Sequence, residues 1–192
     1  MLSGKGFDDV INVAGGIKAW DGQVAVGPEE MGLELLTGKE SIEETLVAAY
    51  SLETGLRDFY LSMIGKVRQD DIKHLFQKLS EIEIVHQDRI FNEYLQVSGK
   101  QVSREAFEND MVIKAVEGGL TTDEYIQMFK PDWKSAVDII SLAMSIEAQA
   151  LDLYTRASER SEDPRSKEAL KKIAEEERVH LKQLGKLMDE RM

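Results

Sequence analysis

Two short stretches, Glu83-Ile84-Val85-His86 and Glu177-Arg178-Val179-His180, share the pattern Glu-x-x-His and stand 94 residues apart. A further glutamate precedes each stretch by thirty residues, at Glu53 and at Glu147. Because residues i and i+3 lie on one face of a helix, each stretch presents a carboxylate and an imidazole to the same point. Two such pairs and two more glutamates form the ligand set of a dinuclear metal centre inside a four-helix bundle.

The ligand types in this set suit two cations and not one. Four carboxylates supply oxygens that bridge two divalent ions and offset most of their charge, and each imidazole caps one ion. Without metal, the same carboxylates would form a costly cluster of like charges in the core of the bundle. Two of the three histidines in the chain carry the motif, whereas His74 has no glutamate three residues before it and is expected on the surface.

A tyrosine follows each leading glutamate by seven residues, at Tyr60 and Tyr154. These side chains are interpreted either as simple core aromatics or as hydrogen-bond donors to a ligand carboxylate. Carboxylate and imidazole ligands suit iron, manganese or zinc, and the residues alone do not choose among these metals. Two adjacent metals suit redox chemistry or hydrolysis.

The composition restricts the class of protein. The chain has 192 residues, of which 42% are hydrophobic, enough for one domain with a proper core and an appendage. A net charge of −12 makes nucleic acid an unexpected partner and disfavours an anionic membrane surface. The lack of cysteine excludes disulfides, thiolate metal sites and cysteine nucleophiles in this chain, and fits a cytoplasmic location. No apolar run reaches the length of a membrane span.

Capping signals mark the ends of four long helices. Ser41-Ile42-Glu43-Glu44 has the form of a capping box, Ser98-Gly99 is a helix end, and Asp163-Pro164 is an N-cap followed by proline. Long helices are therefore expected from Ser41 to about Val67, from about Asp71 to Val97, from about Asp132 to Arg160, and from Pro164 to about Met188.

The connection over residues 99–131 is too long for a hairpin, and short helices are expected near 104–117 and 122–129. A bundle with one long crossover has the ferritin-like topology, so the predicted fold is all-α with an extended N-terminal arm. Apolar stripes place the motif residues inward, and Leu75, Leu79 and Ile82 are expected on the buried face of the second helix. Their acidic neighbours are expected to be solvated: Glu81, Glu175 and Glu176.

The first forty residues are rich in glycine and lack a helical stripe. The segment from Gly6 to Trp20, with its Gly-Gly-Ile-x-x-Trp core, resembles the C-terminal end of a rhodanese domain. A rhodanese works through a reactive cysteine, so sulfur transfer by this chain is excluded. The expected division is a rhodanese remnant over 1–26, a linker over 27–40 and the bundle over 41–192. Two interpretations of this remnant are open: Met1 is an internal methionine of a longer fusion, or the rest of the rhodanese part has been lost.

From Ser41 onward the chain resembles the ferritin-like superfamily, and most closely its rubrerythrin branch. The resemblance rests on the six motif residues with Tyr60 and Tyr154, and it implies a di-iron centre that reacts with peroxide or dioxygen. By similarity, Glu53 and His86 would bind one metal, and Glu147 and His180 the other. Glu83 and Glu177 would then bridge or chelate.

Two departures from the rubrerythrin pattern bear on function. Rubrerythrins usually carry a cysteine-rich electron-donor module, so here a separate protein would have to supply the electrons. Many also have an extra glutamate one turn after the third-helix ligand, where this chain has Ala150, and the matching place on the first helix is Leu56. A six-ligand set without that glutamate is closer to the centre of a ferritin or bacterioferritin.

The sequence thus favours a di-iron oxidoreductase that reduces hydrogen peroxide or dioxygen in an oxidative-stress role, with two irons per chain. Two alternatives stay open: a ferroxidase or iron-handling protein, and a non-catalytic metal-binding module that serves a rhodanese partner. A homodimer is expected from the habit of the family. The apolar residues of the N-terminal arm, such as Phe7 and Trp20, are expected to pack on the bundle or on a second subunit.

Overall fold

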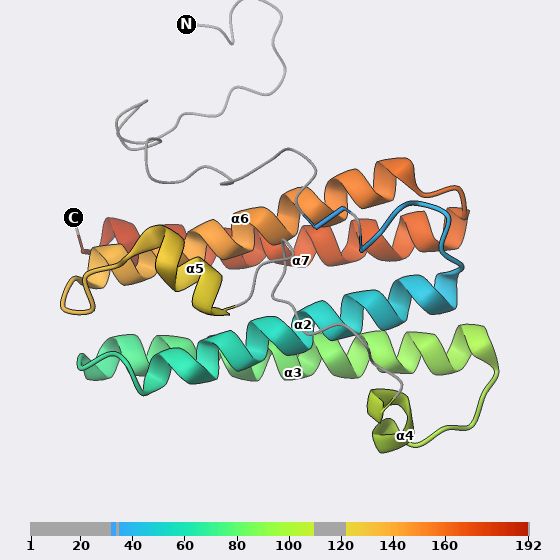
Figure 1. The fold of residues 1–192 in the computed structure, drawn as a ribbon, viewed down its shortest axis with the longest axis horizontal. Coiled ribbons are helices and arrows are strands. Elements are labelled where there is room, and N and C mark those ends of the chain that lie inside the picture. Colours follow the sequence, from blue (N-terminus) through green and yellow to red (C-terminus); the bar gives the residue numbers. More distant parts are fainter. Residues whose placement is uncertain (1–31, 34, 110–121, 192) are drawn as a thin grey trace, which may run out of the picture.

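The computed structural model describes residues 32–33, 35–109 and 122–191. This part of the chain contains six helices and no β-strand, and it forms an all-α, ferritin-like four-helix bundle (Figure 1). None of these helices combines the length and the hydropathy needed to span a membrane. The helices are α2 (Ile42–Ile64), α3 (Asp70–Ser98), α4 (Arg104–Asn109), α5 (Thr122–Phe129), α6 (Ala136–Arg160) and α7 (Pro164–Asp189).

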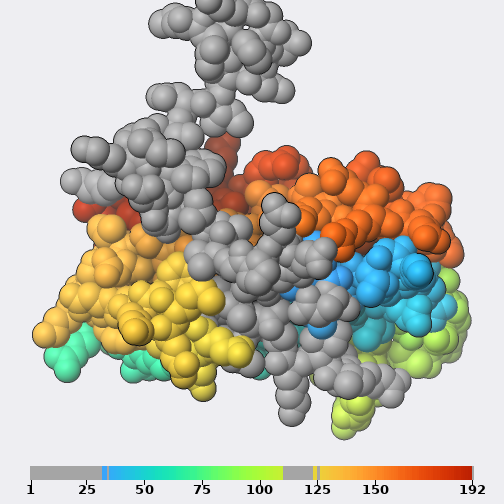
Figure 2. Space-filling view, turned by 45° about the horizontal axis from the view of Figure 1, so that its top comes forward, coloured from blue at the N-terminus to red at the C-terminus, as the bar shows by residue number. Residues whose placement is uncertain are grey.

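The bundle consists of two antiparallel helix hairpins, α2 with α3 and α6 with α7, packed as two layers (Figure 1). The chain leaves α3 at one end of the bundle and enters α6 at the other, as the prediction of one long crossover requires. Helix α5 lies on this crossover. Its residues Ile126 and Phe129 pack against the core, and Figure 2 shows α5 covering the outside of the bundle.

The predicted caps of α2 and α7 are confirmed. Ser41 Oγ accepts a hydrogen bond from the Glu44 amide at 3.3 Å, and Glu44 Oε2 accepts one from the Ser41 amide at 2.9 Å. Asp163 Oδ1 accepts the Arg165 amide at 2.8 Å, with Pro164 as the first helical residue. These bonds satisfy backbone donors that a helix N-terminus leaves without partners.

Some boundaries differ from the prediction. The third helix begins at Ala136 and not at Asp132, because Ser135 is its N-cap and accepts the Asp138 amide at 3.2 Å. Helix α2 ends at Ile64, where Gly65 is the C-cap, three residues before the predicted end. Helix α4 is described as far as Asn109, and the rest of the predicted 104–117 helix lies outside the described residues.

The apolar core is divided into two clusters along the bundle axis. One cluster contains Leu46, Leu52 and Leu153, and the other contains Phe59, Phe76 and Ile146. The motif glutamates and histidines occupy the sequence positions between these clusters on all four long helices. The fold therefore holds a polar layer between two apolar layers.

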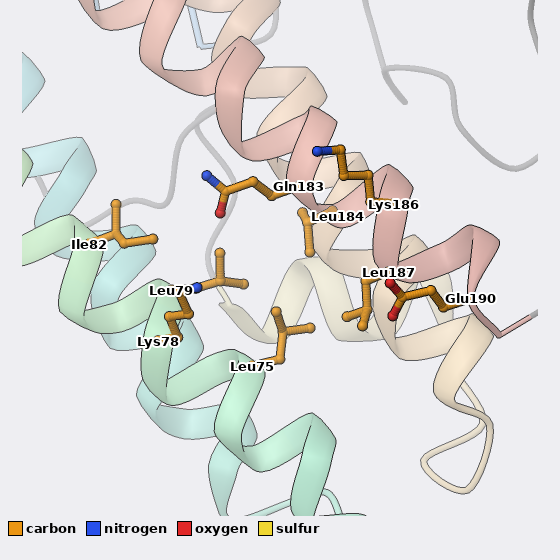
Figure 3. A pocket seen from close by; sticks show the side chains of 9 residues that line it. All are labelled: Leu75, Lys78, Leu79, Ile82, Gln183, Leu184, Lys186, Leu187 and Glu190. Atoms are coloured by element: carbon orange, nitrogen blue, oxygen red, sulfur yellow. The ribbon is translucent and has the colours of Figure 1, made fainter.

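Two positions on α3 are less buried than predicted. Leu75 and Ile82 are half-buried, because they line a groove between α3 and α7 (Figure 3). Leu79, on the same predicted stripe, is buried as predicted. The two hairpins therefore do not close completely along this side of the bundle.

The end of the predicted linker over 27–40 packs on the bundle. Leu33 and Leu36 are buried in the core cluster near the start of α2, and the Gly38 carbonyl accepts a hydrogen bond from the Glu162 amide at 2.9 Å. The segment predicted to be a rhodanese remnant, over residues 1–26, lies outside the described residues, and so does the predicted packing of its apolar residues.

Candidate metal centre

All six motif residues meet in the middle of the bundle. The four carboxylates are fully buried, and the two histidine side chains are nearly so. Each long helix contributes, since α2 carries one glutamate, α6 carries one, and α3 and α7 each carry a Glu-x-x-His pair. The residues are Glu53, Glu83, His86, Glu147, Glu177 and His180. We call the first three the His86 half and the last three the His180 half.

The two halves have the same geometry. In the His86 half, the ring Nδ1 lies 3.3 Å from Glu53 Oε2 and 3.2 Å from Glu83 Oε2. In the His180 half, the ring Nδ1 lies 3.2 Å from Glu147 Oε2 and 3.3 Å from Glu177 Oε2. Nδ1 therefore faces the carboxylates in both rings, and the same atom is available to bind a cation in each half.

The halves are in direct contact across the bundle. The rings of His86 and His180 are stacked, with centroids 4.9 Å apart and an angle of 8° between their planes. Glu83 forms a possible metal-binding group with both histidines, and His180 Nδ1 lies 4.0 Å from Glu83 Oε1. Glu177 belongs to one such group with Glu53 and His86 and to another with Glu147 and His180. Glu83 and Glu177 therefore lie between the halves.

The charges of the cluster are unbalanced without a cation. Burial raises the pKa of the Glu83 carboxyl well above its ordinary range, and the neighbouring Glu53 charge raises it further. Burial would also raise the pKa of Glu53 and of Glu147. The pKa of Glu53 is nevertheless lowered by a hydrogen bond to His86 and by the charge of that ring, and His180 lowers the pKa of Glu147 in the same way. The pKa of His86 is raised, because its contact with Glu53 outweighs its burial.

One further observation, the state of the Glu83 oxygens, supports metal binding by these residues. Both carboxylate oxygens of Glu83 are buried, and neither accepts a hydrogen bond from the described residues, although His86 Nδ1 lies 3.2 Å from one of them. Buried carboxylate oxygens ordinarily have hydrogen-bond donors or a metal. Cations bound between the two halves would satisfy these oxygens and relieve the repulsion among the carboxylates.

Comparison with known proteins agrees with this geometry. The family model described as Rubrerythrin matches residues 44–188. The chain belongs to the rubrerythrin family. A solved structure of a hypothetical protein from Pyrococcus furiosus is similar, with a TM-score of 0.53 and 23% sequence identity over 84% of this chain and 94% of that chain. At that identity it supports the fold alone. No curated protein matches the chain significantly.

The tyrosines of this rubrerythrin-family chain contact the cluster. The Tyr60 hydroxyl donates a hydrogen bond to Glu147, and the Tyr154 hydroxyl lies 3.5 Å from Glu53 Oε1. Each tyrosine thus reaches from its own hairpin to the leading glutamate of the other. Burial and the Glu147 charge raise the pKa of Tyr60 well above its ordinary value, so this hydroxyl keeps its proton.

The prediction for one acidic neighbour was wrong. Glu176, expected in solvent, is half-buried, with its Oε2 2.7 Å from Arg89 Nη2 and 3.7 Å from His86 Nε2. The sequence holds no local sign of this contact, because Glu176 is on α7 whereas both partners are on α3. Glu81, Glu175 and His74 are exposed, as expected.

The two positions where the resemblance would place a further glutamate are apolar. Ala150 and Leu56 are both fully buried in the core clusters. These two positions therefore contribute no carboxylate to the centre. The groups of described residues that could hold a metal ion contain only the six motif residues.

Proposed function

We propose that this chain is a di-iron carboxylate oxidoreductase that reduces hydrogen peroxide or dioxygen and so protects the cell against oxidative stress. The observation that carries the proposal is the buried convergence of four glutamates and two histidines in a rubrerythrin-family bundle. Oxygen and nitrogen donors in this number suit iron, with manganese and zinc as competitors.

The proposed ligands follow the two halves. Glu53 and His86 would hold one iron, Glu147 and His180 would hold the other, and Glu83 and Glu177 would bridge or chelate. The short distances from each Nδ1 to its carboxylates support the terminal ligands. The place of Glu83 and Glu177 between the halves means that either carboxylate could serve both metals.

When bound, the two irons supply the two electrons that peroxide reduction requires. The residues of the chain prepare the site for this chemistry. The four carboxylates balance the metal charge, and the hydrogen bond from Tyr60 orients Glu147. The apolar clusters on either side limit the entry of water. Since the chain has no cysteine, a separate protein would return the electrons.

Anaerobic loading with iron followed by rapid mixing with peroxide or with dioxygen tests the proposal. We expect two irons per chain and oxidation of both in one step. The oxidant that reacts faster, peroxide or dioxygen, is then the preferred substrate. Glu83→Gln should slow this oxidation about tenfold or more, because it removes one carboxylate charge that would hold the metals. Glu81→Gln, at an exposed position on the same helix, is the matched control. Zinc retained in place of iron, or no reaction with either oxidant, would contradict the proposal.

A second candidate is a ferroxidase or iron-handling role, which the apolar positions Leu56 and Ala150 favour. A ferroxidase would oxidise many irons per chain and release them, and iron storage would need a large closed shell. Turnover counted in irons per chain, together with particle mass, separates these roles. A third candidate, a metal-binding module serving a rhodanese partner, would bind metal and show no turnover with peroxide.

A further inference from the structure

The repeat of 94 residues gives every position near the centre a counterpart in the other half. The counterpart of His86 is His180, that of Arg89 is Gln183, and that of Glu176 is Ile82. The motif residues are identical in the two halves, whereas Arg89 and Glu176 are replaced by Gln183 and Ile82. The two halves therefore share their carboxylate side and differ on the opposite side.

A charged pair lies behind the His86 ring. Glu176 comes across from α7, and its Oε2 is buried 3.7 Å from His86 Nε2, within ion-pair range. Arg89, one turn after His86 on α3, lies 2.7 Å from the same oxygen and holds the carboxylate there. His86 is thus placed between carboxylates on both sides of its ring, with Nδ1 toward the cluster and Nε2 toward Glu176.

The corresponding place behind His180 has no such pair. Ile82 and Gln183, the counterparts of Glu176 and Arg89, line the groove between α3 and α7, which has a volume of about 220 Å³ and mainly apolar walls (Figure 3). The carboxylates within ion-pair range of His180 in the described part of the chain all face its Nδ1. The His180 ring therefore lacks the acceptor that His86 has.

We propose that Glu176 is a positioning residue for His86 that makes the two metal sites unequal. This inference rests on the proposed metal centre. A carboxylate beside Nε2 favours the tautomer with the proton on that nitrogen, which leaves the Nδ1 lone pair free for a cation. Carboxylates behind metal-binding histidines have this effect generally, and their loss lowers metal affinity about 10–100-fold. The His86 half consequently binds its metal more tightly than the His180 half.

Titration of the metal-free protein with Co²⁺ tests the inequality. The wild type should bind two ions per chain in two resolved steps, and Glu176→Ala should weaken the tighter step about 10–100-fold. Glu175→Ala is the matched control, because Glu175 is the preceding glutamate, is exposed and pairs only with Arg178 among the described residues. Two ions bound with unchanged affinities in Glu176→Ala would overturn the inference and leave the metal centre intact. No ions bound by the wild type would overturn both.

The same titration in histidine variants shows whether Glu176 acts through His86. Glu176→Ala should have no further effect in a His86→Ala background and its full effect in a His180→Ala background, since coupled residues do not give additive changes. Equal weakening in both backgrounds would mean a merely structural role and would overturn the inference.

Nitrogen NMR of the histidine rings in the Zn²⁺-loaded protein gives a readout that does not depend on affinity. His86 should carry its proton on Nε2 in the wild type and exchange that proton faster in Glu176→Ala. An unchanged ring signal in a folded Glu176→Ala variant would overturn the proposed role of Glu176.

Discussion

Each histidine of the cluster serves one half of the site, so single substitutions should remove one metal at a time. His86→Ala or His180→Ala is expected to lower bound metal from two ions per chain toward one without unfolding the bundle. The bundle should survive because both rings lie between two intact apolar clusters. Elemental analysis with far-ultraviolet circular dichroism checks both points, and His74→Ala at an exposed position is the control. Retention of two metals in both variants would refute the ligand assignment.

The hydroxyl of Tyr60 should matter for stability even without metal. Tyr60→Phe leaves the buried Glu147 carboxylate with one donor fewer, and this is expected to lower the free energy of unfolding by about 1–3 kcal/mol. Urea denaturation of the metal-free protein measures the loss. Tyr94→Phe is a fair control, because the one hydrogen bond of the Tyr94 hydroxyl to the described residues is with the exposed Lys100 ammonium, at 3.4 Å. An equal loss in the two variants would contradict a specific role for the Tyr60 hydroxyl.

The shifted pKa values of the cluster predict how the metal-free bundle responds to pH. Glu83 has a raised pKa, so the fold favours its protonated form, and stability falls as pH rises above the ordinary value of 4.5. His86 also has a raised pKa, so its contribution is present below 6.5 and is lost as pH rises through the folded-state pKa. Between pH 4.5 and 6.5 only the Glu83 change lowers stability, and above 6.5 both changes act in the same direction.

The metal-free protein is therefore expected to have a lower free energy of unfolding at about pH 8 than at about pH 5. The lowered pKa values of Glu53 and Glu147 act in the opposite sense and are felt only below their ordinary value of 4.5. Urea denaturation across this range measures the trend, and Glu83→Gln should flatten it. Stability that rises steadily over the same range would contradict the charge arrangement described for the cluster.

At the scale of the helices, substitution by alanine is expected to have opposite effects on stability at two glycines. Gly38 has a φ of +94°, and an added Cβ would lie 2.5 Å from the Arg160 carbonyl oxygen at the end of α6. Gly185 is inside α7, and an added Cβ there meets nothing within 4 Å. Gly38→Ala should destabilise by at least about 1 kcal/mol, whereas Gly185→Ala should stabilise by about 0.5–1 kcal/mol. Thermal denaturation measures both, and a neutral Gly38→Ala would mean that the segment before α2 does not pack as described.

Local chemistry explains which helix features the sequence predicts well. Ser41 and Asp163 mark helix starts because each bonds backbone amides within its own turn. The start of α6 is harder, because Pro131 and Asp132 look like a helix start as much as Ser135 does, and only the bond to the Asp138 amide decides. Glu176 is beyond prediction from sequence, since its partners belong to another helix and its place depends on how α3 packs beside α7.

The repeat explains why the candidate centre is predictable when other contacts are not. Each motif fixes a helix face by spacing alone, and two faces with the same ligands are expected to meet around cations that balance their charges. The half-buried Leu75 and Ile82 show the limit of this reasoning, since an apolar stripe does not reveal whether its neighbour closes over it. The spacing of apolar residues along a helix determines which face points inward, and the packing of the neighbouring helices determines how much of that face is buried.

At the scale of the whole molecule, one side of the bundle keeps apolar residues in contact with solvent. Val85 and Val179, counterparts in the repeat, are 63% and 48% exposed. Val85 lies one turn from Ile82, and Val179 lies one turn from Gln183, so both belong to the α3/α7 side that carries the groove (Figure 3). Exposed apolar surface beside an apolar groove is typical of a protein interface.

A homodimer formed through this side is therefore the expected assembly. Replacing both Val85 and Val179 with glutamate should shift the protein toward monomer, because four charges would enter the contact between two copies. Light scattering over a range of concentrations measures the mass, and Leu61→Glu on α2, at a residue that is 43% exposed, is the control. A large closed shell would favour iron storage over peroxide reduction. A wild-type monomer at every concentration would mean that the α3/α7 side does not bind a second copy.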